Sequence, residues 1–473
     1  MKQWTPRPDQ RAVMEFLDGR QKACLFSPTG AGKTAMAATW ANAAMNDKCE
    51  LARMLIVAPK LVAQQGWPAE MQKWGHLQGM RDMRVLVNKD FGLVRGSLNG
   101  GMEFNNKSAT KRYLLGLKER VHVVSWDFWP WLVKAYGKNW PYQGVIFDES
   151  SFLRDQGSTR CRAARHVVHK LQAVSHVLEL TGTPNANHGE AIYAQIDLVA
   201  PGLLGDTLTE FRARWCVPAS QNWQTGQVYS WKINPVLQDT LNGLVADVAV
   251  SVPSSLSVRL LEVEQGVTLC DAARSAYDDF ERDWVWNGIT AGSEAVLHGK
   301  LRQMASGFVY DDNNNAVPLD TGKMERLEEL VESIDGPVLV AFEFQEELRR
   351  IKKILGRHVQ DIRENGAKAA FVGGKLKVLA VHPASAGHGV DGLQQVSNQV
   401  IWTTVPQDRE LYDQLNGRLH RHGTQAETVF VHHLMARGTV EERILYDVLP
   451  GKMTLQEAFL QGVRVPQIMP AHG

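Results

Sequence analysis

The 473-residue sequence carries almost no net charge. Its 52 Lys and Arg residues are balanced by 51 Asp and Glu residues, which leaves a formal charge of +1 and an isoelectric point of about 7.7. A chain without a basic excess has no global field that gathers nucleic acid. Any contact with nucleic acid must therefore come from local patches of charge or from backbone amides.

Cysteine is scarce, and long apolar runs are absent. The five cysteines are scattered and none forms a Cys-x-x-Cys pair, which argues against a zinc site and a disulfide framework. The N-terminus, Met1–Pro6, has no apolar signal core, and no uninterrupted apolar run is long enough to span a membrane. We therefore expect a protein of a reducing compartment, the cytoplasm, with no membrane partner.

What the sequence does contain is a glycine-rich loop, Ser27–Thr34, between two structured segments. Ala23–Phe26 is predicted to be a buried strand, and Ala35–Ala44 is rich in helix formers. Strand, glycine-rich loop and helix form the context of a phosphate-binding P-loop, although the first position is Ser27 rather than glycine. The alternative is a strand-to-helix turn that binds no ligand.

Each residue type in this loop suits a nucleotide. Glycines let backbone amides approach phosphate oxygens closely, and the N-terminus of the following helix points partial positive charge at them. The Lys33 ammonium can reach the β- and γ-phosphates, and the Thr34 hydroxyl can ligate Mg²⁺. We expect ATP to be held by Thr29, Gly30, Gly32, Lys33 and Thr34.

A glutamine lies just upstream of the loop. Gln10 follows Pro8 at the start of a segment with helical spacing, Ala12–Leu17. Its side chain can hydrogen-bond the edge of an adenine ring, because an amide both donates and accepts. The alternative is a surface glutamine with no ligand.

Two adjacent acids follow the apolar run Val145–Phe147. In P-loop ATPases one carboxylate at this position binds Mg²⁺ and its neighbour orients the attacking water. We therefore expect Asp148, together with Thr34, to bind Mg²⁺, and Glu149 to orient the water. An acid pair after a strand is common by itself, but here it follows a P-loop in chain order, which strengthens the interpretation.

Further polar residues follow predicted strands. Pro59 and Lys60 come after Met54–Ala58, and Thr181 belongs to a Leu-Thr-Gly-Thr-Pro turn. Open α/β sheets bind ligands beyond the carboxyl ends of their strands. Lys60 could meet a phosphate or lie in solvent, and the Thr181 turn could sense the γ-phosphate or be a plain turn.

The sequence divides into four predicted parts, in keeping with the roughly two to four domains expected at this length. Residues 1–205 hold the P-loop and the acid pair, and residues 206–320 contain predicted helices and few strong strands. Residues 321–446 form a second series of strands and helices without a P-loop, and residues 447–473 form a C-terminal tail. We expect residues 206–320 to be a mainly helical insertion between two sheets.

Two arginines, Arg418 and Arg421, lie three residues apart between the last two predicted strands. On a helix this spacing places both side chains on one face. Two planar guanidiniums can clamp a triphosphate and stabilise transition-state charge. A surface helix with ordinary salt bridges is the alternative.

The ordered set of motifs resembles the superfamily 2 helicase-type motors, and specifically the Swi/Snf-like translocases in their small bacterial and phage form. The resemblance covers nearly the whole chain. Besides the P-loop, it rests on Leu55–Trp74, Phe147–Arg154, Leu180–Gly205, Lys300–Gln303, Gln414–Arg421 and Gly438–Glu442. The segment Ala386–Leu393 departs from the family's usual glycine-rich segment.

The resemblance implies an α/β fold of two RecA-like domains with parallel sheets, with ATP and Mg²⁺ in a cleft and nucleic acid across both domains. The catalytic residues it implies are Lys33, Asp148 and Glu149 on one wall and Arg418 and Arg421 on the other. It also places Gln414 at the nucleotide. The positions that correspond to nucleic-acid contacts are Pro59, Lys60, Ser125, Thr181, Ser385 and His388.

We therefore expect an ATP-hydrolysing translocase on duplex, branched or single-stranded DNA. We expect a monomer that serves replication, recombination or repair in a bacterial or phage-infected cell. A DNA-processing protein is a further candidate partner. We see no histone-reading module, so nucleosome remodelling is not expected. The alternatives are a strand-separating helicase on DNA or RNA and a non-catalytic nucleic-acid scaffold. A wedge hairpin would indicate strand separation, and the sequence does not locate one.

Overall fold

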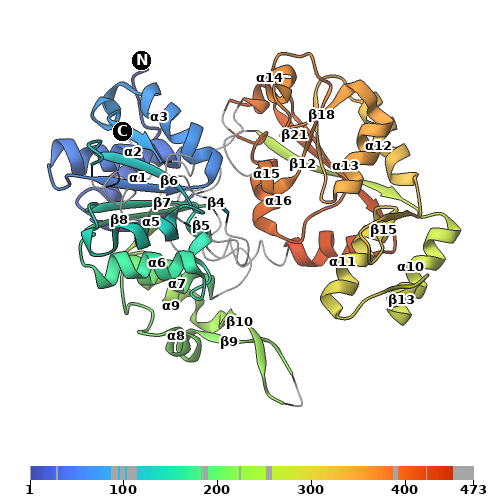
Figure 1. The fold of residues 1–473 in the computed structure, drawn as a ribbon, viewed down its shortest axis with the longest axis horizontal. Coiled ribbons are helices and arrows are strands. Elements are labelled where there is room, and N and C mark those ends of the chain that lie inside the picture. The colour runs from blue at the N-terminus through green and yellow to red at the C-terminus, as the bar shows by residue number, and fades with distance from the viewer. Residues whose placement is uncertain are drawn as a thin grey trace, which may run out of the picture. The chain divides into compact units, whose positions relative to one another are not determined.

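A computed structural model describes two compact units of the chain. The described residues are 2–27, 30–86, 94–95, 102–103, 114, 116–182, 184, 190–222, 225–251, 258–386, 392–421 and 423–450. The first unit comprises the described residues up to 251, and the second comprises those from 258 to 450. Figure 1 labels the helices and strands of both units.

The first unit is built on a parallel sheet that has seven strands among the described residues. In sheet order these are β11 (Ala249–Ser251), β1 (Lys22–Phe26), β8 (His176–Thr181), β7 (Gly144–Asp148), β2 (Met54–Ala58), β6 (Val121–Ser125) and β3 (Met83–Val85). Every pairing is parallel, so the carboxyl ends meet at one edge of the sheet. The central strands β2, β7 and β8 are buried along their whole length, as expected where both faces of a parallel sheet are covered, although β8 includes the polar residues His176, Glu179 and Thr181.

Helices cover both faces of this sheet (Figure 1). One face packs against α1 (Pro8–Leu17), α2 (Lys33–Asn42) and α3 (Trp67–Lys73). The opposite core includes residues of α5 (Trp129–Tyr136), α6 (Thr159–Arg165), α7 (Ala191–Val199), α8 (Leu208–Trp215) and α9 (Gln238–Val245). Alternate residues of each strand enter the two cores: Leu25 and Ile56 face the first, and Phe26 and Leu55 face the second.

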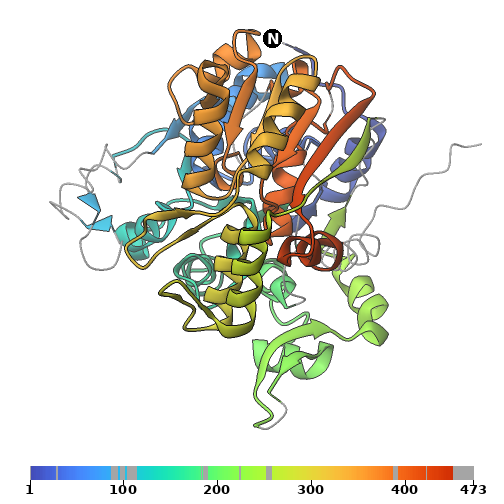
Figure 2. The ribbon, with the colours of Figure 1, turned by 90° about the vertical axis from the view of Figure 1, so that its right-hand side faces the viewer.

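A β-hairpin extends from the helices of the first unit (Figures 1 and 2). Its strands are β9 (Cys216–Gln221) and β10 (Val228–Ile233), which pair antiparallel. Within the described part of the chain they belong to neither parallel sheet. The first unit thus combines a sheet covered by helices with one projecting element.

The second unit has a parallel sheet with six strands among the residues described. Their order is β12 (Arg259–Val267), β21 (Thr428–Ala436), β20 (Gln399–Trp402), β17 (Val338–Ala341), β19 (Val378–Val381) and β18 (Val359–Asp361). Figure 2 looks onto this unit and shows β12 beside the long strand β21. Its helices are α10 (Asp271–Asp283), α11 (Glu294–Ala305), α12 (Gly322–Ser333), α13 (Gln345–Leu355), α14 (Ala367–Val372), α15 (Pro383–Ala386), α16 (Arg409–Asn416) and α17 (Val440–Arg443).

The predicted α/β fold with two parallel sheets is confirmed, but the expected helical insertion over residues 206–320 is not a part of its own. Its residues are divided between the two units, and each half contributes an edge strand, β11 or β12, to a parallel sheet. β11 has only three residues, and β12 is mostly exposed and carries charged residues between its apolar ones. Neither strand therefore shows the apolar run that marks a central strand. The turn of helix Ile444–Val448 crosses the expected tail boundary, and residues 451–473 lie outside the described part.

Candidate ATP site

The P-loop has the predicted order of strand, loop and helix. β1 ends at Phe26, the backbone N–H of Ser27 donates to the Thr181 carbonyl at 2.9 Å, and α2 begins at Lys33. Gly30 and Gly32 have φ values of +86° and +87°, in the left-handed region that glycine adopts without a side-chain clash. The Lys33 ammonium donates to the Ser27 carbonyl at 2.6 Å, so it folds back over the loop. Thr29 lies outside the described residues.

Gln10 lies against this loop. Its side-chain nitrogen donates to the Ala31 carbonyl at 2.9 Å, and its side-chain oxygen accepts the backbone N–H of Arg7 at 3.1 Å. A Cβ atom at Gly32 would come within 2.5 Å of that nitrogen, so only glycine allows this approach. Gln10 is 4% exposed, and the surface-glutamine alternative is therefore wrong. Its contact with adenine stays a prediction.

Asp148 is the last residue of β7 and is held by two tryptophans. The indole N–H of Trp67 donates to its Oδ2 at 2.8 Å, and the indole N–H of Trp126 donates to its backbone carbonyl at 2.8 Å. Burial raises the pKa of Asp148 to about 6, and the neighbouring charge of Glu149 acts in the same direction. The Trp67 hydrogen bond and the positive charge of Lys33 oppose this rise in pKa. The structure therefore brings the P-loop lysine and the predicted metal ligand together.

Glu149 has an unusual backbone conformation. Its φ and ψ are +61° and +59°, a left-handed conformation that costs a residue with a side chain about 1–2 kcal/mol. The Thr181 hydroxyl donates to Glu149 Oε1 at 3.4 Å. The next residue, Ser150, donates to Gln195, whose amide donates to the Pro184 carbonyl at 2.8 Å. These contacts tie the acid pair to the turn that follows β8.

The predicted nucleic-acid residues of the first unit lie at the same edge of the sheet. Pro59 and Lys60 follow β2, while Ser125 and Thr181 end β6 and β8. Pro59 and Thr181 are buried, Ser125 is half-buried, and Lys60 is exposed. Of these four, Lys60 is the side chain that is open to solvent, and the contact of each with DNA stays a prediction.

The second unit corrects one prediction about the arginines. α16 ends at Asn416, so Arg418 and Arg421 lie in the turns after the helix and not on one helical face. Gly417, a weak helix former, follows the last helical residue. Arg418 is buried and Arg421 is half-buried.

Of the remaining predicted residues of the second unit, the structure describes Gln414 and Ser385 but not His388. The Gln414 amide donates to Glu410 within α16 at 3.1 Å. Ser385 is half-buried in α15, and His388 lies outside the described residues. The nucleotide and nucleic-acid roles of these residues stay predictions.

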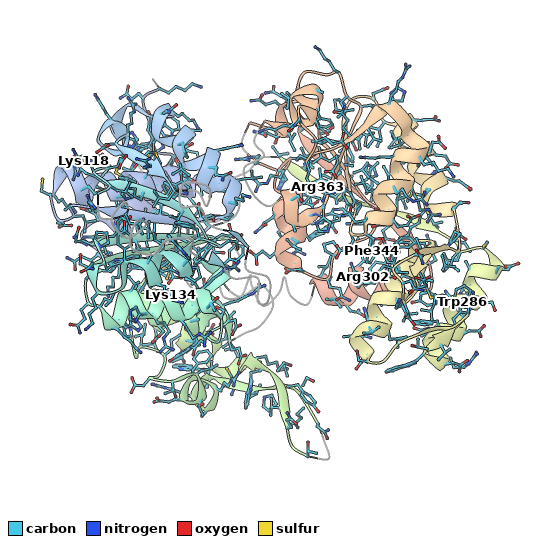
Figure 3. The ribbon with its side chains drawn as sticks, in the orientation of Figure 1. Lys118, Lys134, Trp286, Arg302, Phe344 and Arg363 are labelled. Carbon is cyan, nitrogen blue, oxygen red and sulfur yellow. The ribbon has the colours of Figure 1, made fainter. Side chains whose placement is uncertain are left out.

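Sequence reasoning missed several residues that shape these edges. The hydrogen bond from Trp67 to Asp148 spans 81 positions of the chain, and no local pattern in the sequence predicts it. In the second unit, Lys323 and Glu441 form a buried ion pair at 2.6 Å. Figure 3 labels Arg302 and Phe344 of the same unit, where the guanidinium lies 5.6 Å from the ring centre. The sequence gives a signal only for Glu441, through the Gly438–Glu442 motif.

The described residues lack two further features. Among the described residues no group of three or more His, Cys, Asp or Glu side chains could hold a metal ion. No described helix has both the length and the apolar character needed to cross a membrane.

Comparison with known proteins identifies the family. The SNF2-related domain matches residues 10–281, which is more than half of the chain. Protein p41 of Acyrthosiphon pisum secondary endosymbiont phage 1 is 28% identical over 98% of this chain and 100% of its own length. The SWI/SNF-related matrix-associated actin-dependent regulator of chromatin subfamily A-like protein 1 of Xenopus tropicalis is 25% identical over 92% of this chain. This chain spans 43% of the length of that frog protein.

Among solved structures, the Sulfolobus solfataricus SWI2/SNF2 ATPase core in complex with dsDNA is similar, with 16% identity and a TM-score of 0.42. The match covers 98% of this chain and 94% of that one. The family match spans the P-loop, the acid pair and the turn after β8, which the structure joins at one edge of a sheet. The chain therefore belongs to the SNF2-related family of ATP-dependent helicases and ATPases.

Proposed function

We propose that this ATPase is a DNA translocase that acts on duplex or branched DNA. The observation that carries the proposal is that the P-loop and the acid pair lie next to each other. Lys33 is close enough to Asp148 for its positive charge to lower the pKa of that carboxyl group. A scaffold that had lost catalysis would have no need for this arrangement. The Glu149 conformation also costs free energy, as strained residues at functional sites often do.

The residues present fit a nucleotide with its metal ion. The left-handed glycines and the start of α2 offer backbone amides to phosphate oxygens. Thr34 and Asp148 would hold Mg²⁺, which neutralises phosphate charge when it is bound. Lys33 would leave the Ser27 carbonyl and pair with the phosphates. Trp67 occupies one oxygen of Asp148 and so fixes the plane of the carboxylate.

Glu149 is the residue that would act on water. Its carboxylate would orient the attacking water and accept its proton. The hydrogen bond from Thr181 links this carboxylate to the turn after β8. A movement of the Glu149 carboxylate would shift Thr181 through this hydrogen bond, and a movement of Thr181 would shift the carboxylate. The turn after β8 would therefore change its position with the state of the nucleotide.

Arg418 and Arg421 would supply the remaining positive charge. They belong to the second unit, which has no P-loop, so their action on ATP requires the two units to act together. If the guanidinium reaches the phosphates only when the two units act together on ATP, hydrolysis would be faster with any ligand that favours this joint state. Bound DNA would be such a ligand. Gln414, in the same segment, is proposed to contact the nucleotide, and Gln10 to contact adenine.

DNA is proposed as the substrate from membership of the SNF2-related family, and a phage setting is proposed from the phage relative, which is matched over 98% of this chain and 100% of its own length. We propose that Pro59, Lys60, Ser125 and Thr181 contact DNA from the first unit, and Ser385 and His388 from the second. The proposed setting is replication, recombination or repair in a bacterial or phage-infected cell, with the protein acting as a monomer.

The test compares ATP hydrolysis without nucleic acid and with single-stranded DNA, blunt duplex DNA, forked DNA and RNA. We expect duplex and forked DNA to stimulate the rate strongly and RNA to stimulate it little. Lys33→Ala is the matched control, because it removes the P-loop cation and should abolish hydrolysis with every substrate. Stimulation by RNA alone, or by no nucleic acid, would contradict the proposal.

A further inference from the structure

The β9–β10 hairpin is anchored firmly at its base. Ile233 is buried in the core of the first unit, and the buried Trp215 donates its indole N–H to the Leu204 carbonyl at 2.9 Å. The N–H of Asn234 donates to the Trp215 carbonyl at 2.8 Å and closes the base. A two-stranded hairpin is marginal by itself in water, so these contacts are what hold the ribbon in place.

A stacked cation supports the same base. The Arg212 guanidinium lies 5.7 Å from the centre of the Trp231 ring. The guanidinium is held in place because it also donates two hydrogen bonds to the Glu190 carboxylate, at 2.7 and 3.0 Å. Trp231 is thereby held on the near half of β10. The hairpin is a positioned element on the surface and not a loose loop.

Its outer half is exposed and has a distinct chemistry. The described residues of the whole hairpin, 216–222 and 225–233, include no Asp or Glu, one lysine, two aromatic residues and three Asn or Gln residues. Tyr229 is 61% exposed, and its phenol oxygen accepts a hydrogen bond from the Asn222 amide at 3.3 Å. Gln221 and Gln227 are exposed near it, and Lys232 is exposed closer to the base of the hairpin, where it pairs with Val217.

This combination points to the bases of a nucleic acid. An exposed ring stacks on any base, and side-chain amides can pair with base edges. The absence of carboxylates removes the repulsion that would otherwise keep phosphates away, and Lys232 adds attraction. A protein partner would ordinarily cover a larger apolar area than one tyrosine offers.

Bases can stack on such a ring only where they are not already stacked inside a duplex. We propose that the outer half of the β9–β10 hairpin binds the unpaired bases of single-stranded DNA at a fork or junction. This inference rests on the proposed function as a DNA motor and adds the class of DNA that the first unit recognises. Because the hairpin projects from the helices that cover the sheet, its contact is separate from the ATP-binding edge (Figure 1).

The test uses the full chain and two DNAs, a blunt duplex and a fork with single-stranded arms. Tyr229→Ala should weaken binding to the fork about tenfold or more, because one stacked base is lost, and leave binding to the duplex unchanged. Tyr229→Phe should keep fork binding, because stacking does not need the hydroxyl. Tyr446→Ala is the matched control, since Tyr446 is a 47% exposed tyrosine on the second unit.

A second variant guards against a local folding defect at Tyr229. Lys232→Glu places a carboxylate on the hairpin and should also weaken fork binding, more so at low salt. Fork affinity that stays the same in Tyr229→Ala and Lys232→Glu would overturn the proposal. Equal losses on fork and blunt duplex would overturn it as well, since the residues would then support the motor as a whole. Failure of wild-type ATPase to respond to duplex DNA would refute the proposed function instead.

Discussion

The buried ion pair of the second unit gives the sharpest prediction about stability. Lys323, the second residue of α12, donates to Glu441 Oε1 at 2.6 Å and to the Thr403 carbonyl at 2.9 Å. The other oxygen of Glu441 accepts the Ala436 N–H at 2.9 Å. Both side chains are 3% exposed. The pair therefore joins α12, the ends of β20 and β21, and α17.

The perturbation is Lys323→Met, which keeps the length of the side chain and removes its charge. It leaves a buried carboxylate without its cation, which should reduce the free energy of unfolding by about 3–5 kcal/mol. Glu441→Gln keeps an acceptor for Ala436 and loses the charge, so it leaves the lysine unpaired. The double variant buries no charge and should be more stable than Lys323→Met alone by about 2 kcal/mol.

The pH dependence adds an independent check. Burial raises the pKa of Glu441, and the charge of Lys323 opposes that rise. Without the lysine the folded-state pKa lies still higher than the ordinary value of the unfolded chain. An acid shifted in this direction destabilises the fold at neutral pH, and the penalty disappears as the pH falls and the carboxyl group takes a proton. Lys323→Met should therefore recover stability toward pH 5, and the double variant should not.

Hydrogen exchange at the amides of β20 and β21, measured in increasing urea, reports the stability of this unit alone. A loss below about 1 kcal/mol for Lys323→Met at neutral pH would refute the reasoning, because it would mean that the pair is not desolvated. Strict additivity of the two single variants would refute it too.

Four further substitutions test the ATP site and the core. Lys33→Ala should abolish ATP hydrolysis in a phosphate-release assay and leave the folded structure intact; a near wild-type rate would refute the P-loop assignment. Glu149→Gln should still bind ATP and lose about 10²–10⁴-fold in turnover, whereas loss of binding alone would make the residue structural. Arg421→Ala should bind ATP and DNA normally and lose about 10³-fold of the DNA-stimulated rate, and Lys should not rescue it. Glu179→Gln should stabilise the first unit at neutral pH in thermal unfolding, because burial raises the pKa of Glu179 well above its ordinary value of 4.5, and this gain should vanish in acid.

The local motifs could be predicted from the sequence because their evidence is local. A buried strand, two left-handed glycines and a helix start follow one another within Ala23–Thr34, so their order alone specifies the loop. The acid pair likewise ends a fully buried strand. The parallel sheets follow from the repeated alternation of apolar runs and helices.

The edge strands could not be predicted in the same way. β12 pairs with β21 over nine residues, yet it carries Arg259, Glu262 and Glu264. An edge strand can carry such charges because most of its side chains remain exposed to solvent. Its partner lies far along the chain. The prediction that Arg418 and Arg421 share one helical face was wrong for a related reason. A spacing of three residues suits a helix and a turn equally, and the end of α16 at Asn416 decides between them.

The order of strands explains the contact that the sequence hid most completely. β7 pairs with β2, and β2 pairs with β6, so the segments after β2 and β6 lie near the end of β7. Each segment supplies one indole, Trp67 or Trp126, and both indoles donate to Asp148. Two of the proposed contacts to DNA lie at the ends of the same two strands: Lys60 is two residues beyond the end of β2, and Ser125 is the last residue of β6. A shift of either strand end would therefore reach the proposed metal ligand through a single tryptophan. If DNA binds at the proposed contacts, these two hydrogen bonds would couple its binding to the proposed ATP site.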